Sequence, residues 1–258
     1  MVSSNESMNQ QNKARLCGIL FLLLISVCSF AREPKPIRSS TELLVVTTAD
    51  WSDVQATLQR YERTRAGEKW KPVGEQITVV VGKNGLGWGS GIDSVELREP
   101  SDPVKKEGDG KAPAGIFRLS TAFGYASQEQ PGWRMPYISL TPSVECVDDP
   151  ASKFYNRVLD RAGVSPDWNS SEHMRRQDEL YLWGVVVDHN ADPPKAGDGS
   201  CIFLHIWRGP GEGTVGCTAM PREQLEALLA WLDPARNPLL VQAPTAQYRR
   251  LKRNWKLP

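Results

Sequence analysis

Short apolar and β-branched runs alternate with turn residues over most of the chain, which is typical of a β-rich domain. The run LLVVT at residues 43–47 predicts the first strand. By the same reasoning, further strands are predicted at residues 77–81, 115–119, 137–140, 182–188, 201–207 and 239–242. Glycine-rich and polar stretches at residues 82–91 and 107–114 are predicted to be turns and loops between strands.

Three segments have the spacing of helices. In the first, apolar residues recur at helical spacing between Asp50, a candidate N-cap, and Gly67: they are Trp51, Val54, Leu58 and Tyr61. The second covers residues 152–161, and the third begins at Pro221 and ends before Pro234. Because strands outnumber helices, the predicted fold class is mainly β, or α+β, without internal repeats.

The composition of the chain argues against some classes of protein. The 258 residues allow one or two domains, and 31 basic against 30 acidic side chains leave a net charge of +1. A balance this even argues against a dedicated nucleic-acid binder. Ordinary apolar content argues against wholesale disorder. The five cysteines are an odd number, so at least one thiol has no partner within the chain.

The first 31 residues resemble a secretory signal. An uncharged, mostly apolar run at residues 16–27 follows Lys13 and Arg15 and precedes Ser29-Phe30-Ala31, so cleavage is predicted after Ala31. The run is shorter than the roughly 20 residues of a membrane span, which makes a retained anchor the lesser alternative. Lipid attachment at Cys28 is weaker still because a branched residue precedes it. The protein is therefore expected to be exported, to the periplasm or cell envelope.

Cleavage would change both the charge and the cysteine count. It removes Lys13, Arg15 and Glu6, so the mature chain has a net charge of +1 − (+1) = 0. Cys17 and Cys28 leave with the signal. The cysteines that remain lie in a compartment where disulfides persist: Cys146, Cys201 and Cys217.

The stretch SCIFLHIWRGPGEGTVGCTAMP at residues 200–221 carries the candidate chemistry. Alternation along its strand places one set of side chains on one face: Cys201, Phe203, His205 and Trp207. The aliphatic residues of the other face belong to the core: Ile202, Leu204 and Ile206.

A loop at residues 208–216 with four glycines leads to Cys217, shortly before the predicted helix. The helix dipole and a nearby imidazole are expected to favour the thiolate of Cys217. Gly216 would let backbone N–H groups approach a substrate carbonyl. Cys217 is therefore the candidate nucleophile, and a buried core cysteine is the alternative.

This stretch resembles the catalytic motif of L,D-transpeptidases of the YkuD type, in which a histidine is followed by Ser/Thr-x-Gly-Cys. The matching residues are His205, Thr214, Val215, Gly216 and Cys217. KAPAGIF at residues 111–117 is similar to the family's strand entry. The resemblance covers residues 76–244, preceded by a strand-helix segment at 32–75 and followed by a basic tail at 245–258.

The resemblance implies a sandwich-like β catalytic domain that acts on peptidoglycan stem peptides. Cys217 would be acylated, His205 would be its base, and the backbone of Gly216 and Cys217 would bind the oxyanion. Family members cleave after the third, diamino residue, release D-alanine and pass the acyl group to an amine, without a cofactor or metal. The gap of 217 − 205 = 12 positions is shorter than usual, and Ala219 replaces an arginine common in the family.

Other residues are weaker candidates. Trp207, Arg208 and Thr214 are expected to contact substrate, and Asn190 either lines the cleft or is a polar turn residue. Cys146 and Cys201 are expected to form a disulfide, with separate buried thiols as the alternative.

Rival functions stay open at this point. A carboxypeptidase or amidase would use water as the acceptor, and an inactive module would only bind the cell wall. A metallopeptidase would need His173, His189 and His205, but their equal spacings, 189 − 173 = 16 and 205 − 189 = 16, match no usual ligand pair.

The basic tail is expected to be a solvated end, or to hold the enzyme near an anionic envelope surface. The oligomeric state is left open.

Overall fold

The computed structural model describes residues 35–92, 98–128, 130 and 132–258. The predicted export signal at residues 1–31 lies outside the described residues. Within the described ranges, no helix is both long and apolar enough to cross a membrane.

The main sheet of the described chain closes on itself. Its path is β10-β11-β12-β3-β2-β1-β13-β5, and β10 pairs with β5 as well as with β11. These strands are β1 (Glu42–Thr48), β2 (Gln55–Glu62), β3 (Lys71–Val80), β5 (Ala112–Gly124), β10 (Trp183–Val187), β11 (Phe203–Ile206), β12 (Thr218–Met220) and β13 (Leu239–Pro244). Two short strands, β4 (Leu86–Trp88) and β6 (Tyr137–Ser139), pair in parallel with β5.

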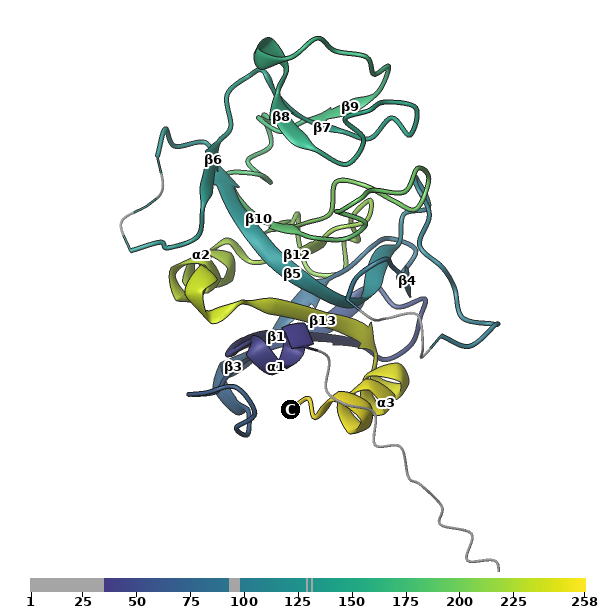
Figure 1. Ribbon diagram of the computed structural model, residues 1–258, viewed down its shortest axis with the longest axis vertical. Coiled ribbons are helices and arrows are strands. Elements are labelled where there is room, and N and C mark those ends of the chain that lie inside the picture. The colour runs from purple at the N-terminus through teal and green to yellow at the C-terminus, as the bar shows by residue number, and fades with distance from the viewer. Residues whose placement is uncertain (1–34, 93–97, 129, 131) are drawn as a thin grey trace, which may run out of the picture. The chain divides into compact units, whose positions relative to one another are not determined.

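A small second sheet has the order β8-β7-β9 and lies at the top of the view in Figure 1. Its strands are β8 (Val158–Asp160), β7 (Val144–Val147) and β9 (Ser171–His173). The helices are α1 (Lys35–Ser39), α2 (Arg222–Trp231) and α3 (Thr245–Trp255), with single 3-10 turns at Arg161–Gly163 and Pro234–Arg236. The prediction of a mainly β domain with a few helices is confirmed, but the main sheet follows a closed path instead of forming the expected sandwich.

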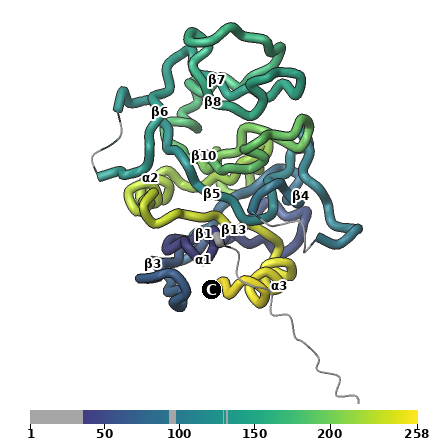
Figure 2. The backbone as a smooth tube through the Cα atoms, in the orientation of Figure 1, coloured from purple at the N-terminus to yellow at the C-terminus, as the bar shows by residue number. Residues whose placement is uncertain are grey.

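The ends of the described chain meet in the sheet. β13, from the C-terminal part, lies between β1 and β5 and runs parallel to β1 (Figure 2). The run LLVV of β1 is buried on both faces. β2 and β13 pair with the two edges of the strand, and α3 contacts it. The predicted strand at residues 43–47 is thus a central strand of the domain.

The predicted helix after Asp50 is wrong. Residues 51 and 52 form a turn, and β2, which begins at Gln55, pairs with β1 on one side and β3 on the other. Within β2, Ala56 and Leu58 are buried at a spacing of two, which suits a strand. Pairing with two neighbours therefore prevails over the helical spacing.

The predicted helix at residues 152–161 is also wrong, since turns lead there into β8. The Ser152 hydroxyl accepts a hydrogen bond from the Phe154 N–H at 3.0 Å and donates to Asp167 at 2.6 Å. Asn156 has a left-handed backbone with φ of 61°. Side-chain bonds of this kind compete with helical hydrogen bonding, which explains the turns.

The remaining strand predictions are confirmed to within a few residues by β3, β5, β6, β10, β11 and β13. The helix predicted from Pro221 is α2, with Pro221 as its N-cap and Leu225, Leu228 and Leu229 buried. The expected solvated tail is wrong, because α3 packs Leu251 and Trp255 into the core beside β13.

Buried residues form two clusters. The larger one fills the main sheet and includes Leu204 of β11 and Ile202, the residue just before β11, as the alternation predicts. The smaller one combines aromatic residues with three cysteines: its members include Phe123, Tyr181, Phe203, Cys146, Cys201 and Cys217. The candidate site is built on this second cluster.

Candidate active site

Two neighbouring parallel strands position the candidate nucleophile and base. In the pairing of β11 with β12, Leu204 lies opposite Thr218 and His205 opposite Ala219. Cys217 immediately precedes β12, and its Sγ accepts a hydrogen bond from the Phe203 N–H at 3.3 Å. Since paired residues of parallel strands face the same side, the predicted alternation brings His205 and Cys217 to one pocket.

His205 is held at its Nδ1 nitrogen. This atom lies 2.7 Å from the carbonyl oxygen of Ile206, and the ring packs edge-on to Tyr181 with centroids 5.1 Å apart. The residue is 6% exposed, and burial lowers the pKa of His205 to about 4. The resting imidazole is therefore neutral.

The Cys217 thiol is also neutral at rest. Burial raises its pKa to about 12, and the charge of Glu172 raises it further, while the hydrogen bond from the Phe203 N–H and the charge of Lys105 act in the lowering direction. The expectation that a helix dipole favours the thiolate is wrong, because β12 and Pro221 separate Cys217 from α2.

Thr214 fixes the backbone around the thiol. Its hydroxyl accepts from the Gly216 N–H at 3.1 Å and donates to the Cys217 carbonyl at 2.6 Å. The main chain of Thr214 bonds to Val81 and Lys83, which anchors the loop to the segment after β3. The sequence predicts that Thr214 contacts substrate; in this structure its hydroxyl positions the backbone beside the thiol. Val215 beside it is 74% exposed.

The Cys146–Cys201 disulfide is present and ties β7 to the start of the histidine strand. Cys201 has a left-handed backbone with φ of 55°, and its carbonyl accepts from the Cys217 Sγ at 3.6 Å. Of the cysteines in the described part of the chain, Cys217 is the free one. The predicted division into a bridge and a free thiol is confirmed for these residues.

A pocket of about 400 Å³ surrounds the pair. Of the residues expected at the site, those that line it are His205, Trp207, Arg208, Thr214, Gly216 and Cys217. Asn190 lies outside this lining, since its side-chain amide donates to the carbonyls of Lys195 and Gly199 at 2.9 Å. It is a buried turn residue with φ of 49°.

Sequence reasoning missed several charged residues that line the pocket: Lys105, Glu107, Asp148, Glu172, Arg176 and Glu212. Glu172 comes from β9 and accepts a hydrogen bond from the Tyr181 hydroxyl at 2.6 Å. Arg176 and Arg208 both bind Asp178, which holds them at one side of the pocket. Glu212 lies in the glycine loop at residues 208–216, but no motif marks the others, because they come from segments far from that loop in the sequence.

The other two histidines are separate from the site. His173 is largely exposed, with its Nδ1 3.6 Å from Glu145. His189 is buried, with its Nε2 3.0 Å from the Asp198 carbonyl, and burial lowers its pKa to about 4. Within the described residues, no group of His, Cys, Asp or Glu is arranged to hold a metal ion.

Comparison with known proteins identifies a family. The family model of the L,D-transpeptidase catalytic domain, YkuD, matches residues 53–241. The match runs from just before β2 into β13, so it begins earlier than the expected residue 76. No curated protein and no solved structure matches the chain.

Proposed function

Because the chain belongs to the L,D-transpeptidase catalytic domain family, we propose that it is an exported transpeptidase that acts on peptidoglycan stem peptides through a Cys217 thioester. The observation that carries the proposal is the free Cys217 thiol in one pocket with His205, on neighbouring parallel strands. The pocket lining carries both signs of charge, which suits a stem peptide with a diamino acid and carboxylates.

In the first half-reaction, the Cys217 thiol gives its proton to Nε2 of His205 while sulfur forms a C–S bond with the substrate carbonyl carbon. The carbonyl π pair moves onto oxygen. When that pair returns, the C–N bond breaks and the imidazolium proton goes to the leaving D-alanine amine. At rest, proton transfer from the Cys217 thiol to the neutral, buried imidazole of His205 is unfavourable. The proton therefore moves only as the carbon of the bound carbonyl accepts the sulfur.

In the second half-reaction, an acceptor amine attacks the thioester and His205 removes its proton. A new C–N bond forms, the C–S bond breaks, and the departing sulfur takes the proton back from His205. Water in place of the amine would give a carboxypeptidase with the same residues. The proposal is for the amine as acceptor.

One incubation distinguishes the two acceptors. The purified protein is mixed with a tetrapeptide stem and a D-amino acid, and the products are identified by mass spectrometry. Transpeptidation predicts an exchanged tetrapeptide that Cys217→Ala does not form. Tripeptide alone would support hydrolysis.

A covalent probe tests whether the site is active. Exposure to a carbapenem is expected to add one acyl group to the wild-type protein and none to Cys217→Ala. A wild-type protein without an adduct would contradict the proposal and favour a module that only binds the cell wall.

Export belongs to the proposal as well. The Cys146–Cys201 disulfide supports it, because such bonds persist in oxidising compartments. Intact-mass analysis of the protein from an exporting host, with alkylation, is expected to give a chain that starts at Arg32 with one free thiol. A chain that keeps residues 1–31 would contradict cleavage.

A further inference from the structure

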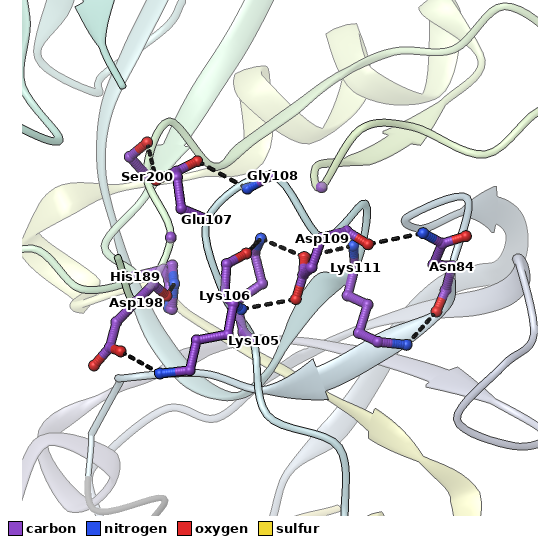
Figure 3. Close-up of polar contacts among 12 residues, drawn as sticks. Asn84, Lys105, Lys106, Glu107, Gly108, Asp109, Lys111, His189, Asp198 and Ser200 are labelled. Atoms are coloured by element: carbon purple, nitrogen blue, oxygen red, sulfur yellow. Dashed lines mark hydrogen bonds and ion pairs between the residues drawn. The ribbon is translucent and has the colours of Figure 1, made fainter. Parts of the chain in front are cut away.

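Lys105 is a buried cation in the wall of the pocket. Its side chain is 3% exposed, although lysine is almost never fully buried without a partner. The ammonium donates to the Asp109 carboxylate at 2.7 Å and to the Lys106 carbonyl at 2.6 Å (Figure 3). These bonds keep the charge in place without saturating the three donors of an ammonium.

Asp109 is itself fixed by the loop before β5. It accepts from the backbone N–H of Lys106 at 2.7 Å and from that of Lys111 at 2.9 Å. A carboxylate held by main-chain donors cannot swing away from its partner. The Lys105 ammonium is thus preorganised, which is what electrostatic stabilisation of a transition state requires.

The ammonium faces the nucleophile's backbone. Lys105 lines the same pocket as Cys217, and its Nζ lies 3.9 Å from the point that a Cβ on Gly216 would occupy. The positive charge acts to lower the pKa of Cys217. The Gly216 N–H, expected as an oxyanion donor, already donates to Thr214. A second hydrogen-bond donor beside Gly216 would therefore supply the oxyanion contact that is expected from this N–H.

We infer that Lys105 is a catalytic residue that stabilises negative charge beside Cys217, first the charge that develops on sulfur as its proton leaves and then the charge on the oxyanion of the tetrahedral intermediate. This inference rests on the proposed function. The ammonium donates a hydrogen bond to the oxygen that receives the carbonyl π pair, and it keeps its proton throughout. When the pair returns and the C–N bond breaks, Lys105 is unchanged.

Lys106 provides a matched control. It is the next residue of the same loop and carries the same charge, but it is 59% exposed and binds Asp198 at 2.7 Å. Lys106→Met therefore removes an equal charge outside the pocket.

The test is carbapenem acylation followed by intact mass at a series of probe concentrations. Lys105→Met is expected to lower the saturating acylation rate about 10²- to 10³-fold, with the half-saturating concentration unchanged. Lys105→Arg, which keeps the charge, is expected to stay within about tenfold of wild type. Lys106→Met is expected to behave as wild type.

A second readout does not depend on the acylation chemistry. Alkylation of Cys217 by iodoacetamide follows the thiolate fraction, so Lys105→Met is expected to move its pH profile to higher pH. Lys105→Arg and Lys106→Met are expected not to move it. All three variants leave unchanged the other titratable and charged groups that line the pocket: Glu107, Asp148, Glu172, Arg176, Tyr181, His205, Arg208 and Glu212.

Folding is controlled by a double variant. Lys105→Met leaves Asp109 without its ion partner, whereas Lys105→Met with Asp109→Asn removes both charges. The double variant is expected to fold and to show the same slow acylation. Circular dichroism checks the fold of each protein.

Two results would overturn the inference. One is a saturating acylation rate that does not change in Lys105→Met. The other is an effect confined to the half-saturating concentration, which would assign Lys105 to binding a substrate carboxylate. Failure of the proposed function gives a different result, since the wild-type protein then forms no adduct on Cys217. Without an adduct there is no oxyanion for Lys105 to stabilise. The pH profile of iodoacetamide alkylation then tests by itself whether Lys105 stabilises negative charge on the Cys217 sulfur.

Discussion

The Nδ1 atom of His205 lies 2.7 Å from the carbonyl oxygen of Ile206, the next residue in the chain. A carbonyl oxygen only accepts hydrogen bonds, so Nδ1 must carry the proton. The Nε2 nitrogen then holds the lone pair and is the basic atom of the ring. A main-chain group thereby sets the tautomer, a task for which other enzymes use a carboxylate.

His205→Ala is expected to lower the saturating rate of carbapenem acylation about 10²- to 10⁴-fold, because it removes the group that accepts the thiol proton. His173→Ala is the control, since its side chain is 74% exposed on β9 and lies outside the pocket lining. Acylation is followed by intact mass. A loss of less than tenfold in His205→Ala would show that another group accepts the proton.

The pH dependence of thiol reactivity follows from the neutral pair at rest. Burial raises the pKa of Cys217 to about 12, so the thiolate fraction grows about tenfold per pH unit through the alkaline range. The rate of iodoacetamide alkylation of the wild-type protein is therefore expected to rise steadily from pH 7 to pH 10. A plateau below pH 8 would instead indicate a thiolate-imidazolium ion pair at rest.

Glu172 is expected to shift that profile to higher pH in the wild-type protein. The charge of Glu172 raises the pKa of Cys217, so Glu172→Gln should move the profile to lower pH. Glu179→Gln, at a side chain that is 71% exposed, is the matched control and should leave it in place. A Glu172→Gln profile that stays in place or moves to higher pH would refute this assignment.

The sequence predicts the local parts of the site well. Alternation in the segment around His205 predicts which face of the strand carries the imidazole. The glycine loop predicts that Cys217 lies beside that strand. Both follow from short-range rules, because a strand presents every second residue on one side. The confirmed Cys146–Cys201 bridge rests on the cysteine count and the export signal.

The missed features depend on long-range pairing. The helical spacing after Asp50 belongs to β2, whose conformation is decided by β1 and β3 on either side. Lys105, Glu172 and Tyr181 reach the pocket from three separate segments. No local pattern places them beside a thiol that is more than thirty residues away in the chain. The closed path of the sheet has the same origin, since it depends on β10 pairing with β5.

The Cys146–Cys201 disulfide is expected to contribute about 4 kcal/mol to stability by the chain-entropy relation. It closes a segment with a sequence separation of 55, and this constrains the unfolded chain. The measurement is urea unfolding of Cys217→Ala with and without Cys146→Ala and Cys201→Ala, a background in which the free thiol cannot exchange. A reductant is expected to destabilise only the protein that has the disulfide.

The bridge also has an expected effect on the chemistry. It holds Cys201, whose carbonyl accepts from the Cys217 Sγ at 3.6 Å and whose N–H donates to Asn156 at 2.9 Å. With Cys217 intact, the variant without the bridge should therefore acylate more slowly than wild type at a temperature where both are folded. Asn156→Ala, which removes the other restraint on Cys201, should slow acylation in the same way while the bridge remains. An equal acylation rate in all three proteins would restrict the disulfide to stability, because the Cys201 carbonyl would then keep its place without either restraint.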